Sequence, residues 1–207
     1  MSDPYKVALL FGAPGVGKGT QGRLIGCIPG FRHIATGDIF RGLDRESDLG
    51  RVFTEYSTRG ELVPDEFTIQ VFEEHLRGLI EAGTYNPETE LVVLDGIPRN
   101  ISQAKILSDD IEVLRVVHLV CNDDEEIVRR LAGRALQQGR ADDAKEEVIR
   151  RRLDIYRRET RPVLEFFGDE LVTEVYAIGT PARVLRDALD VLVPVHEANF
   201  SNVLVRR

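Results

Sequence analysis

The most constraining feature of this sequence is a glycine-rich segment that directly follows a short apolar run near the N-terminus. Residues 12–20 read GAPGVGKGT, the apolar run covers Val7–Phe11, and a helical pattern begins at Lys18. Glycines allow successive backbone N–H groups to turn toward phosphate oxygens, and the start of the following helix adds a positive dipole end. A strand, this loop and a helix in register predict a phosphate-binding P-loop.

The loop supplies the candidates for binding the phosphates of ATP. They are Gly15, Val16, Gly17, Lys18, Gly19 and Thr20. The Lys18 ammonium can reach the β- and γ-phosphates, and Thr20 or the backbone beside it would lie near Mg²⁺. The motif departs from its usual form because Gly19 stands before the hydroxyl residue.

A second apolar run ends in a carboxylate. Leu91–Asp95 reads LVVLD, and a carboxylate at the end of a buried strand can organise the waters around Mg²⁺. An Asp after a strand is commonly only a turn residue. Beside a P-loop, however, Asp95 is the candidate metal-binding residue.

Runs rich in Val, Ile and Leu alternate with helical patterns along the chain. The expected strands are Val7–Phe11, His33–Ala35, Leu91–Asp95, Val116–Val120 and Val175–Ile178. The expected helices are Lys18–Ile25, Asp38–Arg45, Phe67–Ile80, Ile101–Asp109, Glu125–Leu136, Ala144–Tyr156 and Ala182–Leu192. This alternation predicts an α/β fold with a five-stranded parallel sheet and helices on both faces.

The length of the chain, 207 residues, suits one domain spanning residues 1–207. Two places depart from simple alternation and are expected to be inserts. Residues 36–66 would carry several helices, and the arginine-rich residues 130–142 would form a short lid. Pro162 is expected to end or kink the helix before it.

Charge and cysteine content exclude several classes of protein. A net charge of −8 argues against general nucleic-acid binding, which needs a basic surface. Cys27 and Cys121 lie far apart and form no Cys-x-x-Cys pair, so neither a disulfide framework nor a zinc site is indicated. No apolar run is long enough for a signal peptide or a membrane span. We therefore expect a reduced, cytoplasmic setting and no membrane partner.

The basic residues are concentrated in one segment. Residues 129–161 carry more basic than acidic residues although the whole chain is acidic. Guanidinium groups gathered in this way can bind a small polyanion. A solvated, ion-paired helix is the alternative, because Glu147/Arg151 and Asp154/Arg158 both have i, i+4 spacing.

Further motifs narrow the class of P-loop protein. The guanine-specifying Asn-Lys-x-Asp of GTPases is missing, since residues 121–124 read CNDD. The motifs present are GKGTQ at 17–21, TGD at 36–38 followed by Arg41, GELVPDE at 60–66, and DGIPR at 95–99 followed by Gln103. Together they resemble the adenylate kinase family, and the resemblance runs from the P-loop to Gly179. It implies reversible transfer of the γ-phosphoryl group of Mg·ATP to AMP by a monomer, giving two ADP.

The same resemblance implies an acceptor site built on the inserted helices. Arg41 and Arg99 would grip the acceptor phosphate, residues 60–63 would line the base through backbone groups, and Gln103 would hydrogen-bond adenine. Guanidinium groups suit bidentate contacts to phosphate oxygens. The implied AMP-binding residues are Thr36, Arg41, Gly60, Leu62, Val63, Gly96, Arg99, Gln103, Arg140 and Arg152.

The resemblance also interprets the basic segment as a lid that closes over ATP. The implied lid arginines are Arg130, Arg134, Arg140 and Arg152, with Gly179 in the adenine-contact loop. The implied catalytic residues are Lys18, Arg99, Arg130, Arg140 and Arg152. Residues 136–141 replace a longer insert that binds zinc in some members, and they contain no cysteine, so no structural zinc is expected.

No general base stands out. The four histidines are His33, His75, His118 and His196. They have no metal-ligand spacing, so we expect them to be structural or exposed. This suits the implied chemistry, because a monophosphate has a second pKa of about 6 and is already anionic near neutral pH.

Alternatives remain for two properties: the identity of the acceptor base, and whether the protein converts its substrates at all. Thr36 and Gln103 follow the AMP pattern, whereas Asn100 resembles the UMP/CMP kinases and Ile97 stands where the family usually has an aromatic residue. Ile97 is therefore expected to loosen the acceptor pocket. A non-catalytic nucleotide-binding regulatory protein is a further alternative; it should lack Lys18 or several arginines, and none is missing.

Overall fold

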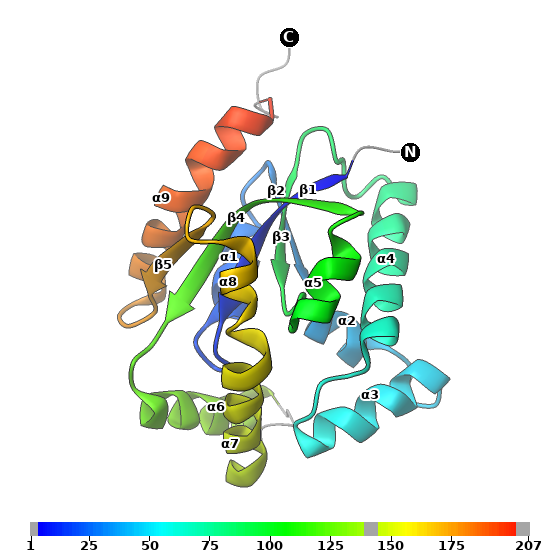
Figure 1. The fold of residues 1–207 in the computed structure, drawn as a ribbon, viewed down its shortest axis with the longest axis vertical. Coiled ribbons are helices and arrows are strands. Elements are labelled where there is room, and N and C mark those ends of the chain that lie inside the picture. The colour runs from blue at the N-terminus through cyan, green and yellow to red at the C-terminus, as the bar shows by residue number, and fades with distance from the viewer. Residues whose placement is uncertain (1–3, 139–144, 202–207) are drawn as a thin grey trace.

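The computed structural model describes residues 4–138 and 145–201, and its centre is the parallel sheet shown in Figure 1. The strands are β1 (Tyr5–Gly12), β2 (Phe31–Ala35), β3 (Leu91–Asp95), β4 (Ile111–Val120) and β5 (Val172–Tyr176). They lie in the order β2-β3-β1-β4-β5, and every neighbouring pair is parallel. The predicted five-stranded parallel sheet is confirmed.

Helices connect the strands. They are α1 (Lys18–Ile25), α2 (Thr36–Gly42), α3 (Asp48–Arg59), α4 (Asp65–Glu81), α5 (Ile101–Leu107), α6 (Asp124–Gln138), α7 (Glu146–Ile155), the π-helical turn η2 (Tyr156–Thr160), α8 (Val163–Phe167) and α9 (Pro181–Asn199). Every expected helix is present, with bounds that differ by a few residues at most ends. The largest difference is at the end of α9, which was expected at Leu192 and lies at Asn199, while its start is set by the Thr180 hydroxyl, which accepts the backbone N–H of Arg183.

The helices cover both faces of the sheet, as the apolar strands require. Ala8 and Leu10 pack with residues of α1 and α9 on one face. Val7 and Leu9 pack with residues of α4, α5 and α8 on the other. Side chains alternate between faces along a strand, and a strand buried on both faces is apolar throughout. Leu9 has no exposed surface.

The insert between β2 and β3 has its own small hydrophobic cluster. Phe40, Val63 and Val71 are buried there, and the rings of Phe40 and Phe53 stack with centroids 5.2 Å apart at 7°. Helix α3 begins at a Ser47 cap, whose hydroxyl accepts the N–H of Gly50 at 3.1 Å. This cluster is much smaller than the two that flank the sheet, so α2 and α3 depend on few buried contacts.

The elements beyond the sheet gather at one end of it. In Figure 1, α3, α6 and α7 lie below the sheet, beyond the carboxyl ends of its strands. In open parallel sheets, ligands bind in the crevice at this edge. Within the described part of the chain, no helix combines the length and the apolar character needed to cross a membrane.

Candidate active site

The P-loop takes a backbone course that requires glycine. Gly12, Gly15 and Gly17 have φ angles of 141°, 81° and 118°. A Cβ on Gly12 would lie 2.4 Å from the carbonyl oxygen of Leu119, and Gly17 is the N-cap of α1. Side-chain-bearing residues rarely adopt such angles. The glycines therefore curl the loop around the first turn of α1, as an anion-binding loop requires.

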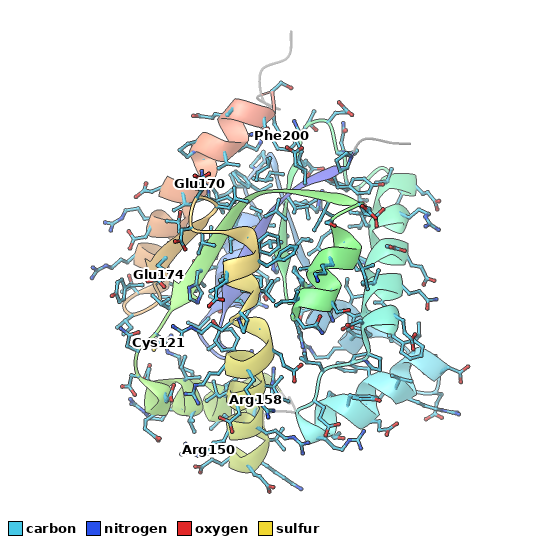
Figure 2. The ribbon with its side chains drawn as sticks, viewed as in Figure 1. Cys121, Arg150, Arg158, Glu170, Glu174 and Phe200 are labelled. Carbon is cyan, nitrogen blue, oxygen red and sulfur yellow. The ribbon has the colours of Figure 1, made fainter. Side chains whose placement is uncertain are left out.

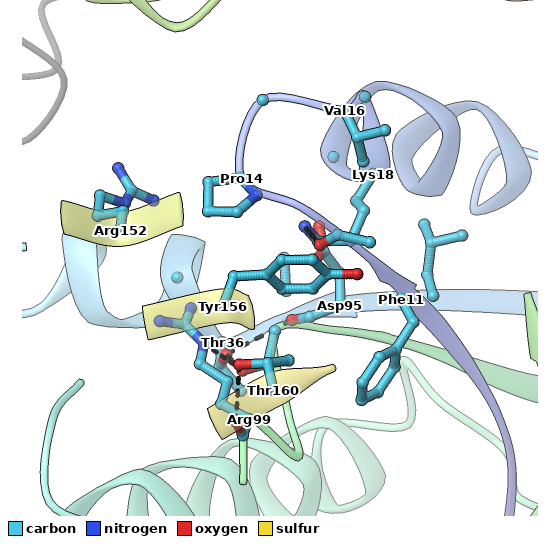
Figure 3. Close-up of a pocket in the computed structure, with 18 of the residues that line it drawn as sticks. Phe11, Pro14, Val16, Lys18, Thr36, Asp95, Arg99, Arg152, Tyr156 and Thr160 are labelled. Atoms are coloured by element: carbon cyan, nitrogen blue, oxygen red, sulfur yellow. Dashed lines mark hydrogen bonds between the residues drawn. The ribbon is translucent and has the colours of Figure 1, made fainter. Parts of the chain in front are cut away.

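Lys18 is held against this loop. Its Nζ donates to the carbonyl oxygens of Gly12 at 2.7 Å and Ala13 at 3.1 Å. These bonds fix the ammonium group at the floor of the loop, near the carboxyl end of β1. Figure 3 shows Lys18 pointing toward Asp95.

Several cations converge on this point. Burial is the main cause that lowers the pKa of Lys18 to about 8, and the positive charges of Arg99, Arg152 and Arg134 lower it further, while Asp95 opposes them. Groups that repel one another in this way bind a shared anion favourably, because the anion offsets the repulsion. The electrostatics therefore suit a polyanionic ligand.

The ends of β2 and β3 bring Thr36 beside Asp95. The two strands are paired so that Ala35 lies opposite Asp95. The hydroxyl of Thr36, which is buried, donates to the Gly96 carbonyl at 3.0 Å. The Arg99 Nε donates to the same carbonyl at 2.7 Å, as the close-up in Figure 3 shows. One carbonyl oxygen thus orients both Thr36 and Arg99.

A buried amide network supports the acceptor side. The Gln103 side-chain oxygen accepts the backbone N–H of Arg99 at 2.7 Å. The Gln103 amide nitrogen and the Asn100 amide nitrogen both donate to Asp65 Oδ1 at 2.8 Å. Asn100 also caps α5 by accepting the Gln103 N–H at 2.8 Å. The network joins the first turn of α4 to α5.

The two departures from the AMP pattern therefore have structural explanations. Asn100 is a helix cap, and Ile97 is 1% exposed within the core cluster that contains α4 and α5. Neither side chain lines the cavity described below. The expectation that Ile97 loosens the acceptor pocket is wrong, because its side chain fills the core.

Three of the predicted lid arginines, Arg130, Arg134 and Arg152, lie on α6 and α7. Arg130 donates to the carbonyl oxygens of Val16 at 3.3 Å and Ala177 at 3.1 Å, and its Nε donates to Glu126 at 2.8 Å. It therefore links the P-loop to the segment that precedes Gly179. Arg140 lies outside the described residues.

These groups surround a cavity of about 650 Å³, a volume typical of small-molecule sites. Arg41, which pairs with Asp38, also lines it. The predicted residues that line the cavity are Gly15, Val16, Gly17, Lys18, Gly19, Thr20, Thr36, Arg41, Gly60, Leu62, Val63, Asp95, Gly96, Arg99, Gln103, Arg130, Arg134, Arg152 and Gly179. The structure thus brings together every described residue of the predicted set.

Some lining residues were not predicted. Among them are Phe40 and Phe53 on the inserted helices, and Tyr156 and Thr160 on η2. Helical spacing alone marks Phe40 and Phe53 as core residues. The pair Tyr156 and Thr160, four residues apart just before Pro162, was a usable signal of one helix face turned toward the site.

The available ligands suit magnesium rather than zinc. The described residues contain no group of three His, Cys, Asp or Glu side chains that could hold a metal ion. Asp95 and Thr20 both line the cavity. One carboxylate, a hydroxyl and substrate phosphates are typical of protein-bound Mg²⁺. The expectation of no structural zinc concerns residues 136–141, of which 139–141 lie outside the described part.

Comparison with known proteins gives consistent matches. A family model described as Adenylate kinase matches residues 10–172. The adenylate kinase of Kocuria rhizophila is 39% identical over 178 residues, which are 83% of this chain and 90% of that protein. The adenylate kinase of Thermobifida fusca is 38% identical over 191 residues, covering 89% and 96%. That of Thermus thermophilus is 36% identical over 188 residues, covering 88% and 94%.

Proposed function

The chain belongs to the adenylate kinase family, and on this premise we propose that it transfers the γ-phosphoryl group of Mg·ATP to AMP, giving two ADP. One observation carries the proposal. Lys18 from the P-loop, Arg99 from the acceptor side and Arg152 from α7 line a single cavity and lie close enough to affect the pKa of Lys18. Two anionic nucleotides bound facing each other would offset the positive charges of these three side chains.

The chemistry follows from positioning and charge. The P-loop and Lys18 hold the β- and γ-phosphates, while Arg41 and Arg99 hold the acceptor phosphate. Arg130, Arg134, Arg140 and Arg152 neutralise the transferring group. An anionic monophosphate attacks without a general base, so alignment and charge stabilisation supply the catalysis. Asp95 and Thr20 would hold Mg²⁺, which would supply positive charge to the phosphates when bound.

The hydrogen bonds of Gln103 support adenine as the acceptor base. The Gln103 amide uses one N–H for Asp65 and its oxygen for Arg99, which leaves a second N–H as a donor. A ring nitrogen of adenine is an acceptor that matches this donor. Residues 60–63 line the same cavity. The pyrimidine alternative rested on Asn100, and its amide is engaged in capping α5 and in binding Asp65.

We also propose the wider setting of the activity. Residues 1–207 form one domain, with residues 36–66 as the acceptor insert and residues 130–142 as a short lid. The protein works as a monomer in the cytoplasm on ATP and AMP. The net charge of −8 supports the absence of nucleic-acid partners, and no membrane partner is expected.

The experiment is a panel assay. Purified protein with Mg·ATP is given AMP, dAMP, UMP, CMP or GMP, and nucleoside diphosphates are separated by chromatography. We expect kcat/KM for AMP to exceed that for UMP or CMP by about a hundredfold or more. Lys18→Ala and Arg99→Ala should lose most turnover. A preference for UMP or CMP would indicate the pyrimidine kinase, and ATP binding without turnover of any monophosphate would indicate the regulatory protein.

A further inference from the structure

The turn η2 joins the lid helix α7 to α8 and lies against the nucleotide cavity. It is a π-helical turn, and both Tyr156 and Thr160 line the cavity. In the view of Figure 3 the Tyr156 ring is drawn near the labels of Lys18, Asp95 and Thr36, which line the same cavity. Such turns are rare in proteins and frequent at functional sites. The contacts of η2 therefore bear on the chemistry proposed above.

Two side chains fasten this turn to different parts of the site. The Thr160 hydroxyl donates to the carbonyl oxygen of Arg99 at 2.7 Å. The Tyr156 hydroxyl lies 3.0 Å from Nε2 of His118. The first contact joins η2 to the acceptor arginine, and the second joins it to β4 in the centre of the sheet.

The surroundings of His118 decide the direction of that second hydrogen bond. His118 is 7% exposed, lies opposite Phe11 of β1, and has its Nδ1 3.3 Å from Oε1 of Glu174 on β5. Figure 2 places Glu174 on this edge strand. A carboxylate beside Nδ1 favours the tautomer protonated there, which leaves Nε2 as an acceptor. Tyr156 is therefore the donor.

The charged groups around the pair keep both partners in suitable protonation states. Burial holds the pKa of His118 below its ordinary value; Glu174 opposes this shift, and Arg161 and Lys18 add to it. Burial also raises the pKa of Tyr156 to about 12. A neutral imidazole and a protonated phenol form this bond near neutral pH.

Arg152 is the cavity-lining arginine nearest to this anchor along the chain. Arg152 lies four residues before Tyr156, one helical turn away, and both side chains line the cavity. On its other side, a Cβ on Gly60 would lie 3.1 Å from Cγ of Arg152. The lid helix thus has the acceptor insert on one side and the Tyr156 anchor at its end.

We propose that Tyr156 and His118 are positioning residues for phosphoryl transfer: their hydrogen bond fastens η2 to β4 and thereby holds Arg152 over the P-loop. The proposal rests on the proposed function, because Arg152 acts there on the transferring group. Tyr156 and His118 take no part in the chemical step themselves.

The first test compares Tyr156→Phe with Tyr85→Phe. Tyr85 is a matched control, since its phenol is also buried but lies outside the cavity and its oxygen has no hydrogen-bond partner. We expect kcat of Tyr156→Phe to fall about tenfold with KM for ATP and AMP within about twofold, because misplacement of a transition-state group affects kcat. Equal kcat in the two variants and the wild type would overturn the proposal.

Variants of His118 separate positioning from general packing. In His118→Gln the amide oxygen can accept the same bond, so activity near neutral pH should be largely retained. His118→Leu should lose about as much kcat as Tyr156→Phe, and the double variant His118→Leu/Tyr156→Phe should lose no more than either. Multiplied losses in the double variant would contradict a shared interaction.

The pH dependence of activity is a further test, because a change in packing alone would not alter it. Protonation of His118 removes its acceptor, so the activity of His118→Gln relative to wild type should be higher at about pH 5 than at about pH 7.5. Glu174→Gln should move the acid limb of the wild-type profile to lower pH, since it lowers the pKa of His118. Profiles that coincide after scaling would overturn the proposal.

A titration of His118 by NMR tests the bond without any activity. Loss of the Tyr156 donor should raise the pKa of His118, because the hydrogen bond stabilises the neutral ring. An unchanged pKa in Tyr156→Phe would overturn the contact itself. If the wild-type protein made no diphosphate but this shift appeared, the proposed function would fail while the contact stood.

Discussion

The donor and acceptor sides of the cavity are built in different ways. On the donor side, backbone groups of nine consecutive residues, 12–20, and the start of α1 form the binding loop, and β1 fixes them inside the buried sheet. On the acceptor side, Asp65 of α4 binds the amides of Gln103 on α5 and of its cap Asn100, and α2 packs with α4 in a small cluster around Phe40. The first depends on local backbone geometry, and the second depends on contacts between distant segments.

Because of this difference, substitutions on the two sides should affect activity and stability in different proportions. A donor-side substitution that keeps the glycines should affect chemistry and leave the fold intact. An acceptor-side substitution in the network should affect both, because the same hydrogen bonds shape the pocket and hold α4 to α5. The following changes test that distinction.

The largest effect is expected from Lys18→Met. It removes the cation nearest the transferring phosphates, so kcat should fall about a thousandfold, the size of a lost transition-state contact. The free energy of unfolding should change by less than about 2 kcal/mol, since two hydrogen bonds are lost and a buried charge is removed. Coupled ADP assays and urea unfolding measure the two quantities. Lys105→Met, at an exposed position on α5, is the control. A much larger loss of unfolding free energy in Lys18→Met would contradict the distinction between the two sides.

A smaller effect on activity, with a larger effect on stability, is expected from Asp65→Ala. It leaves the amides of Gln103 and Asn100 without their acceptor, which should cost about 1–3 kcal/mol of stability. KM for AMP should rise about tenfold while KM for ATP stays within about twofold. Asp65→Asn keeps an oxygen acceptor and should lie near wild type. A rise in both KM values would show that the two sides are not independent.

The pH dependence of ATP binding should report on the donor side alone. The pKa of Lys18 is lowered from 10.5 to about 8, so between these values the unfolded chain binds more protons and stability rises with pH. Phosphates favour the charged lysine, so ATP affinity should fall about tenfold between about pH 7 and pH 9. Calorimetry measures this fall, which should be missing in Lys18→Met. An equal fall in that variant would assign the dependence to another group.

The smallest effect is expected where the two sides meet. Glu61 of the acceptor insert forms an ion pair with Arg151 of α7, and the Arg151 side chain is 53% exposed. Exposed pairs of this kind contribute at most about 1 kcal/mol. Glu61→Gln should therefore leave kcat within about twofold and lower the melting temperature only slightly. A loss of kcat as large as that of Tyr156→Phe would show that this ion pair helps to bring α7 and the acceptor insert together for catalysis.

The fold was largely predictable because its signals are local. The P-loop glycines and the apolar runs gave β3 and the start of α1 at Lys18 correctly, and the run Val7–Phe11 lies within β1. Strand ends were less predictable: β4 begins at Ile111 because Ile111 pairs with Tyr5, and β2 begins at Phe31 because Phe31 pairs with Leu91. Pairing depends on the neighbour in space, which a single apolar run does not contain.

The site was predictable wherever a motif carried it. Lys18, Thr36, Asp95 and Arg99 lie in short motifs, and all of them line the cavity. The roles of Asn100 and Ile97 were not predictable, since a cap and a core residue are recognised only from their contacts.

By itself, the sequence determined the phosphate loop, the parallel α/β class and the family, because glycine angles, strand periodicity and motif spacing act within a few residues. Only the tertiary structure decided that Asp65 holds Gln103 and that His118 meets Tyr156, 38 positions later in the chain. Such contacts depend on how the sheet orders its strands and on which helix faces they leave exposed to one another. Long-range packing sets these distances, and no local pattern in the chain encodes them.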